Sequence, residues 1–105
     1  MMEKVSPMTR VLSDVIPFGR NNAIMRHVLA SRLGMSDRGM RRAIQTARDE
    51  GLIILNAQDG RGYYQSAEIQ DMVAQYHQDT ARAMAILKRR KTLRTTLINA
   101  GVDIT

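Results

Sequence analysis

Residues 26–44 read RHVLASRLGMSDRGMRRAI, and this stretch decides the fold. Val28, Leu29 and Leu33 recur at helical spacing from Met25 onward, and Gly34 then ends the helix, because glycine accepts the left-handed backbone of a tight turn. Ser36 follows as a helix N-cap, with Asp37 in the first turn near the positive end of the helix dipole. The stretch therefore predicts two helices joined by a sharp turn. The second helix runs to Gly51 and buries a face of four residues: Met40, Ala43, Ile44 and Ala47.

The segment before this stretch predicts one more helix and a short extended step. Ser6 and Pro7 are typical of a helix start, because serine caps and proline fits the first turn without wasting an N–H group. Apolar residues follow at helical spacing from Met8 to Ile16, and Pro17 ends the helix. Ala23 and Ile24 form an apolar step that we expect to add one rung to a small sheet.

The segment after it changes from helical to extended spacing. Residues 52–55 predict an apolar strand, residues 56–62 a turn, and residues 63–65 a return strand. The fold class is therefore mainly α with a small β-hairpin (α+β). Two helices, a sharp turn, a third helix and a hairpin have the order of a winged helix-turn-helix, which we expect to form a domain over residues 1–65.

Residues 66–105 predict a long C-terminal helix that forms a second, dimerising domain. Ser66 is the expected cap and Gly101 the expected stop. Apolar residues recur at alternating spacings of four and three, which is typical of a coiled-coil seam. The residues expected at a homodimer interface are Ile69, Val73, Tyr76, Ala83 and Leu87. In the alternative, the first half of the helix packs on its own domain and the basic segment 88–94 is a solvated tail. The sequence leaves open whether that segment contacts DNA.

Composition excludes several classes of function. The 105 residues include no Cys and only two His, so we expect no disulfide, no thiol nucleophile and no metal site. No Ser-His-Asp order or paired carboxylates indicate catalysis, so we expect neither an enzyme nor a cofactor. No apolar run is long enough for a membrane span, and the polar start is not typical of a signal peptide, which favours a cytoplasmic protein. The net charge of +6 favours a polyanionic partner.

The side of the 36–50 helix opposite its apolar face predicts a nucleic-acid interface. The residues expected to face outward are Ser36, Arg38, Arg41, Arg42, Gln45 and Arg48. Arg pairs with guanine and Gln with adenine, so Arg42 and Gln45 are the candidates for base contacts. Ser36, Arg38 and Arg41 are the candidates for phosphate contacts. Arg61, between two glycines at the hairpin tip, is expected to reach a neighbouring groove or phosphate. In the bland alternative, this helix face is merely solvated.

The 26–44 stretch resembles helix-turn-helix transcription factors, with Ala30, Gly34, Ser36 and the apolar positions in register. With residues 44–54 and 60–64 added, the chain is similar to the DNA-binding domain of biotin-ligase-type repressors and to small uncharacterised winged-helix proteins of phages and prophages. The resemblance covers residues 10–90. It implies sequence-specific binding of double-stranded DNA by a small transcriptional regulator of phage or mobile-element origin. No ligase domain is present, so biotin chemistry is not implied.

Two other functions fit the same pattern. One is a phage packaging or replication accessory factor, which should form higher rings with weak sequence preference. The other is a winged-helix module for protein interaction or RNA binding, which should ignore duplex DNA. A regulator should instead protect a short, discrete duplex site.

Overall fold

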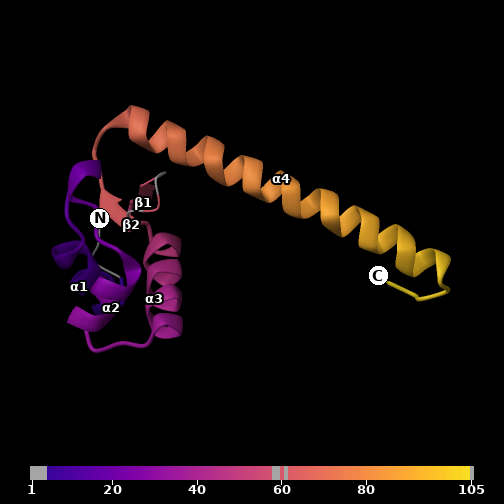
Figure 1. Ribbon diagram of the computed structural model, residues 1–105, viewed down its shortest axis with the longest axis horizontal. Helices are drawn as coiled ribbons and strands as arrows, with labels where there is room; N and C mark the ends of the chain where they lie inside the picture. The colour runs from indigo at the N-terminus through magenta and orange to yellow at the C-terminus, as the bar shows by residue number, and fades with distance from the viewer. Residues whose placement is uncertain (1–4, 58–59, 61, 105) are drawn as a thin grey trace. The chain divides into compact units, whose positions relative to one another are not determined.

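The computed structural model describes residues 5–57, 60 and 62–104. In order along the chain, these residues form α1 (Pro7–Val15), the 3-10 helix η1 (Arg20–Asn22), α2 (Arg26–Arg32), α3 (Asp37–Asp49), β1 (Ile54–Ala57), β2 (Gly62–Gln65) and α4 (Ile69–Asn99) (Figure 1). The expected class, mainly α with a small β-hairpin (α+β) and a long C-terminal helix, is confirmed. The chain divides into two compact units, Met1–Met72 and Val73–Thr105, so the start of α4 belongs to the first unit.

Helix α1 starts at Pro7, as the sequence predicts, but its cap differs from the expected one. The Ser6 hydroxyl makes no capping bond to the α1 backbone. Instead Glu50, from the end of α3, receives the Ser6 N–H at 3.1 Å, the Ser6 hydroxyl at 3.1 Å and the Thr9 hydroxyl at 2.5 Å. A carboxylate at a helix N-terminus is favoured by the unpaired N–H groups and the helix dipole. Glu50 therefore ties α1 to α3.

The turn between α2 and α3 follows the sequence prediction. Gly34 has φ +64°, and the Met35 N–H donates to the Ala30 carbonyl at 2.9 Å, which closes the end of α2. The Ser36 hydroxyl receives the Gly39 N–H at 3.0 Å and caps α3. Leu29 from α2 and Met40 and Ile44 from α3 are buried in the main core together with Leu12 and Ile16. This packing fixes the orientation of α3.

The hairpin begins two residues later than the sequence predicts. Strands β1 and β2 pair antiparallel from Ile54–Gln65 to Ala57–Gly62. Residues 52 and 53 lie outside β1, because the Leu52 N–H donates to the Ala47 carbonyl at 2.9 Å and completes the end of α3 at Gly51 (φ +104°). The predicted turn from residue 56 is thus wrong at its start.

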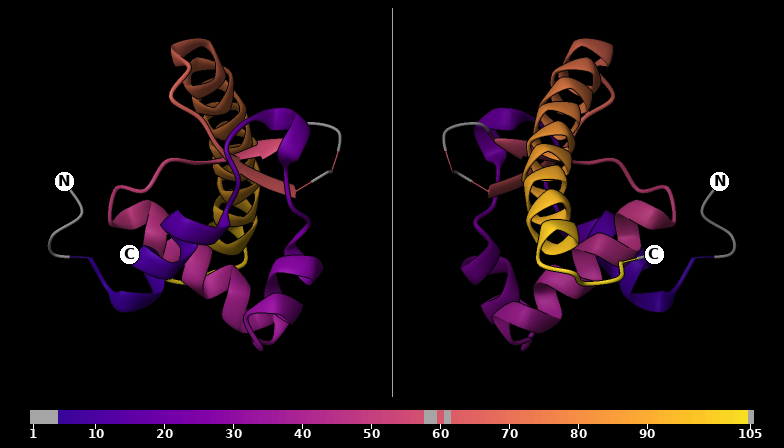
Figure 2. Two further views of the ribbon diagram at one scale, coloured as in Figure 1. Left: turned by 90° about the vertical axis from the view of Figure 1, so that its left-hand side faces the viewer. Right: turned by 90° about the vertical axis from the view of Figure 1, so that its right-hand side faces the viewer.

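The rung expected at Ala23 and Ile24 is confirmed. Ile24 exchanges two backbone hydrogen bonds with Tyr63, at 2.9 and 2.8 Å, so the segment before α2 lies beside β2 (Figure 2). Gly62 is required there: it has φ +101°, and an added Cβ would overlap the Ile24 backbone. Farther along β2, the buried Gln65 amide donates to the Ser13 and Ile16 carbonyls at 2.9 and 2.7 Å. These bonds satisfy backbone acceptors at the end of α1.

Helix α4 is 31 residues long and begins and ends with local signals. Ser66 lies three residues before Ile69, so it is not at the expected N-cap position of α4. Its hydroxyl instead orders the approach to the helix, because it receives the Glu68 N–H at 3.0 Å and donates to Asp71 at 2.8 Å. At the far end Gly101 has φ +82°, and the Val102 N–H donates to the Leu97 carbonyl at 2.9 Å. The expected stop at Gly101 is confirmed. None of the residues in α4 is buried.

Candidate nucleic-acid interface

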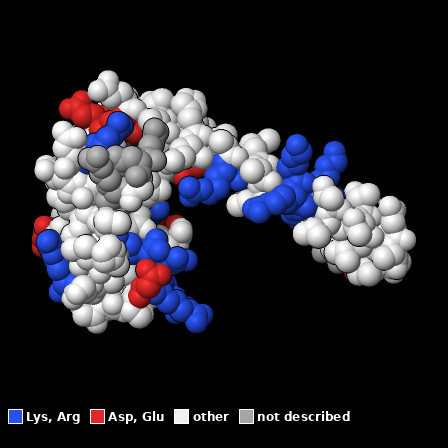
Figure 3. Space-filling model, in the orientation of Figure 1, with Lys and Arg blue, Asp and Glu red and all other residues white. Residues whose placement is uncertain are grey.

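Helix α3 presents a cationic face opposite the face that it buries. Met40, Ile44 and Ala47 are at most 2% exposed. The expected outward residues Ser36, Arg38, Arg41, Arg42 and Gln45 are all exposed. Figure 3 shows Lys and Arg side chains gathered over the part of the first unit where Figure 1 places α3. A helix held by its apolar face can thus offer these cations at fixed spacing to a partner.

The start of α3 is held by its cap. Asp37 occupies the first turn and Ser36 the N-cap position. A Cβ at Gly39 would lie 3.1 Å from the Ser36 oxygen, which is tighter than an ordinary contact. Glycine costs about 1 kcal/mol in a helix relative to alanine. At Gly39 the missing Cβ leaves the capping hydroxyl of Ser36 uncrowded.

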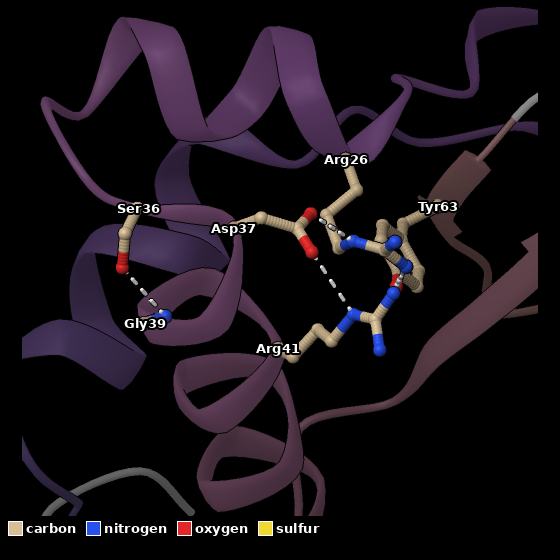
Figure 4. Close-up of polar contacts among 6 residues, drawn as sticks. All are labelled: Arg26, Ser36, Asp37, Gly39, Arg41 and Tyr63. Atoms are coloured by element: carbon tan, nitrogen blue, oxygen red, sulfur yellow. Dashed lines mark hydrogen bonds and ion pairs between the residues drawn. The ribbon is translucent and has the colours of Figure 1, made fainter.

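Asp37 also joins two arginines from different helices. One carboxylate oxygen lies 2.6 Å from Nε of Arg26 on α2, and the other lies 3.1 Å from Nε of Arg41 on α3 (Figure 4). The hydrogen bond from Arg26 is the main cause that lowers the pKa of Asp37, and the same bond raises the pKa of Arg26. A terminal nitrogen of Arg26 also lies 3.4 Å from the Tyr63 hydroxyl. These four residues form what we call the Asp37 cluster.

Arg48 differs from its sequence interpretation. It does not face outward with the other cations, because its guanidinium donates to the Ile54 carbonyl at 3.0 Å and to Asn56 Oδ1 at 3.1 Å. It also lies over the Tyr63 ring, 5.7 Å from the centroid. Arg48 is therefore a structural link between α3 and the hairpin, and the expectation of an outward side chain is wrong. The last turn of α3 is close enough to the strands for a long side chain to reach them.

Of the two remaining site residues, the structure describes Gln45 and does not describe Arg61. The Gln45 amide donates to Asp49 at 3.0 Å along the exposed face of α3. Arg61, the expected contact at the hairpin tip, lies outside the described residues. The sequence interpretation missed Arg26 and Tyr63 as members of the Asp37 cluster. The signal available for Arg26 was its place as the first residue of the 26–44 stretch, a cation in the first turn of α2.

The expected dimer seam on α4 is exposed within the single chain. Ile69, Val73, Tyr76 and Leu87 have between 46% and 75% of their surface accessible, and Ala83 is also exposed. Leu93, Leu97 and Ile98 are exposed farther along the helix. The basic residues between them are all exposed: Lys88, Arg89, Arg90, Lys91 and Arg94. Helix α4 thus carries apolar and cationic side chains that its own chain leaves accessible to a partner.

Two kinds of feature are absent among the described residues: a metal site and a membrane-spanning helix. Within residues 5–57, 60 and 62–104, no three His, Asp or Glu side chains converge as a metal site would require. In the same part of the chain, no helix combines the length and apolar character that crossing a membrane demands. Comparisons with protein-family models, curated proteins and solved structures return no match to this chain.

Proposed function

We propose that the chain is a sequence-specific double-stranded DNA-binding protein in which residues 7–65 act as a winged helix-turn-helix. The observation that carries the proposal is the two-sided character of α3: an apolar face packed in the core and an exposed face with Arg38, Arg41 and Arg42. A helix is about 10–12 Å across, which matches the width of the DNA major groove. We call α3 the recognition helix below.

The exposed polar and cationic residues of α3 divide into two proposed roles. Arg42 makes no hydrogen bond or ion pair to any described residue, so its guanidinium is available for a base edge, where Arg commonly pairs with guanine. Gln45 must give up its bond to Asp49 before it contacts adenine. Ser36 and Arg38, at the start of the helix, are placed for phosphate oxygens, because free N–H groups and the dipole favour anions there.

We further propose that α4 pairs with α4 of a second copy of this chain, in antiparallel orientation. In a parallel pair the seam would continue from Leu87 to Arg90 and Arg94, and each would face its own copy as a like charge. In an antiparallel pair centred between Tyr76 and Thr80, Ile69 faces Leu87 of the partner subunit.

The charges along α4 support the same orientation. Its first part carries the acidic residues Asp71 and Asp79, preceded by Glu68, whereas the charged residues from Arg82 to Arg94 are all basic. Antiparallel pairing brings the basic segment of each copy toward the acidic part of the other, and opposite charges within about 10 Å attract at ordinary salt. Two copies would then present two recognition helices to two DNA half-sites.

The biological role that fits these properties is a small cytoplasmic transcriptional regulator of phage or mobile-element origin. Selection of bound duplexes from a random pool at fixed salt tests it, and a short recurrent site is the expected result. Arg42→Ala should cost about 1–3 kcal/mol on that site and relax one base position, whereas Arg38→Ala should weaken all sequences alike. Arg10→Ala removes a cation from α1 and serves as the control. Rings without a preferred site would indicate a packaging factor, and no duplex binding would indicate an interaction or RNA-binding module.

Sedimentation at micromolar concentration tests whether two copies of the chain pair through α4. The wild-type chain should sediment as a dimer and Leu87→Glu as a folded monomer, because the introduced carboxylate must lose its water at the seam. Ala85→Glu introduces the same charge two residues away, on the opposite side of the helix, and should remain dimeric. A monomeric wild-type chain would exclude the dimer, and a dimeric Leu87→Glu chain would place the interface elsewhere.

A further inference from the structure

The Asp37 cluster brings two cations from different helices to one point on the surface. Arg26 comes from the first turn of α2 and Arg41 from the second turn of α3, and both meet the carboxylate of Asp37 (Figure 4). Two guanidinium groups repel each other, and the carboxylate of Asp37, which contacts both, offsets that repulsion. With one negative and two positive charges, the three groups keep a net charge of +1.

Most of the donors of these two arginines are not used by Asp37. A guanidinium has five N–H groups, and the carboxylate is bound through Nε of each arginine. One terminal nitrogen of Arg26 faces the Tyr63 hydroxyl at 3.4 Å. The terminal nitrogens of Arg41 have no partner among the described residues, and 64% of that side chain is accessible to solvent. The cluster can therefore bind a second anion without releasing Asp37.

We propose that Arg26 and Arg41 together bind one phosphate, with Asp37 and Tyr63 as positioning residues. This inference depends on the proposed function, because the phosphate that we assign is one of the DNA backbone beside the recognition helix. Planar guanidinium groups match phosphate oxygens and form charge-assisted hydrogen bonds with them. The cluster stands at the start of α3, where the helix dipole also favours an anion.

Asp37 acts in two opposing ways on such a phosphate, and the geometry decides between them. Its charge repels the phosphate, but its two short contacts hold two long side chains in place before DNA arrives. An arginine that is already fixed loses less conformational entropy when it binds. Because the contacts use only the Nε groups and leave the outer edges available, we infer that positioning outweighs repulsion.

The test compares Asp37→Asn with Asp14→Asn, which removes the same charge from the exposed surface of α1. Affinity for a duplex is measured by fluorescence anisotropy over a series of salt concentrations. Asp14→Asn should leave binding equal or slightly tighter, since one negative charge is lost. Asp37→Asn should weaken binding by roughly three- to tenfold relative to it, the range for one lost positioning hydrogen bond. Equal or tighter binding by Asp37→Asn would overturn the proposal.

A double-mutant cycle separates positioning from a loss of structure. Arg41→Ala should weaken binding in the wild-type background and lower the magnitude of the logarithmic salt slope by about 1. In the Asp37→Asn background the same change should have a smaller effect, because Arg41 is no longer held there. Independent effects would overturn the positioning role. Unfolding transitions recorded for each variant should show an unchanged folded population at the assay temperature, which separates a loss of positioning from a loss of structure.

A second arm uses inorganic phosphate, so that the site and the proposed function can fail separately. The arginine Nε–H resonances of the wild-type chain are followed by NMR during a phosphate titration. Those of Arg26 and Arg41 should shift together and saturate, and Asp37→Asn should abolish the saturation. Shifts without duplex binding would retain the anion site, assign it to a free phosphate compound and reject the DNA function. Duplex binding without the paired shifts would reject the site and retain the function.

Discussion

The first unit and helix α4 use apolar residues in opposite ways. Among the described residues, the buried hydrophobic side chains all lie within residues 1–72, where they form two clusters, a larger one that includes Leu12 and Ile44 and a smaller one around Tyr64. Helix α4 contains apolar residues at similar density, yet none of them is buried. Burial of apolar surface is the main stabilising contribution in a folded domain. The first unit therefore buries the apolar surface that stabilises it, whereas the apolar side chains of α4 remain accessible in the single chain.

The difference shows what helical periodicity does and does not reveal. The spacing of Met40, Ile44 and Ala47 in α3 and that of Val73, Tyr76 and Leu87 in α4 both identify one face of a helix. The first face is covered by α1, α2 and the hairpin, and the second remains accessible in the single chain. Periodicity thus identifies the face but not the molecule that covers it. The following substitutions test this contrast.

Gly62→Ala should have the largest effect and Gly101→Ala a much smaller one. Both glycines have positive φ, at +101° and +82°, so both substitutions strain the backbone. At Gly62 the new Cβ would also overlap the Ile24 backbone, whereas at Gly101 nothing lies within 4 Å. We expect Gly62→Ala to abolish cooperative unfolding of the first unit, as measured by circular dichroism on heating. A Gly62→Ala chain as stable as Gly101→Ala would contradict the described packing of the segment before α2 on β2.

The next largest difference should be between truncating a buried side chain of the first unit and truncating an exposed side chain of α4. Ile44→Ala removes a side chain that is 2% exposed, and it should lower the free energy of unfolding by about 2–5 kcal/mol. Ile86→Ala, at a position on α4 that is 48% exposed and off the seam, should change it by less than about 0.5 kcal/mol. Urea titration of both variants measures the two changes. Similar losses would mean that α4 is packed as tightly as the first unit.

Acid should weaken the link between α1 and α3. Hydrogen bonds from Thr9 and Ser6 lower the pKa of Glu50 below its usual 4.5. A carboxyl group with a lower pKa in the folded state adds stability that is fully present above its unfolded pKa and disappears as the pH falls through the folded one. The free energy of unfolding should therefore decrease below about pH 5. Glu50→Gln should reduce this acid sensitivity, and Glu68→Gln, at the entrance to α4, should not. Identical slopes in all three chains would remove Glu50 from the account.

Local signals in the sequence predicted most of the element boundaries, because each depends on neighbouring residues. Gly34, Ser36 and Gly101 mark turns and caps where expected. The predicted start of the first strand is two residues too early, because the Leu52 N–H donates to the Ala47 carbonyl at the end of α3. The apolar pattern of residues 52–55 alone does not indicate that hydrogen bond. The hairpin contacts of Arg48 depend on where its long side chain reaches after folding.

The contacts that hold the site together could not be predicted from the sequence, since they join distant residues. Arg26 and Asp37 are 11 residues apart, and Glu50 and Thr9 are 41 apart. Nothing in the local pattern of either partner identifies the other. The exposed row of Arg38, Arg41 and Arg42, by contrast, followed from helical spacing once the buried face was known. A sequence can thus predict a helix face better than it predicts the links between elements.

Duplex binding by the recognition helix is the central claim, and its salt dependence tests the claim most directly. The measurement is the dissociation constant for a selected duplex over a salt series, for the wild-type chain and for a variant with Arg38→Ala, Arg41→Ala and Arg42→Ala combined. The wild-type chain should bind with a steep salt slope, and the variant should lose affinity and about 2–3 units of that slope. Equal affinities and slopes for both chains, or no duplex binding by the wild-type chain, would contradict the account.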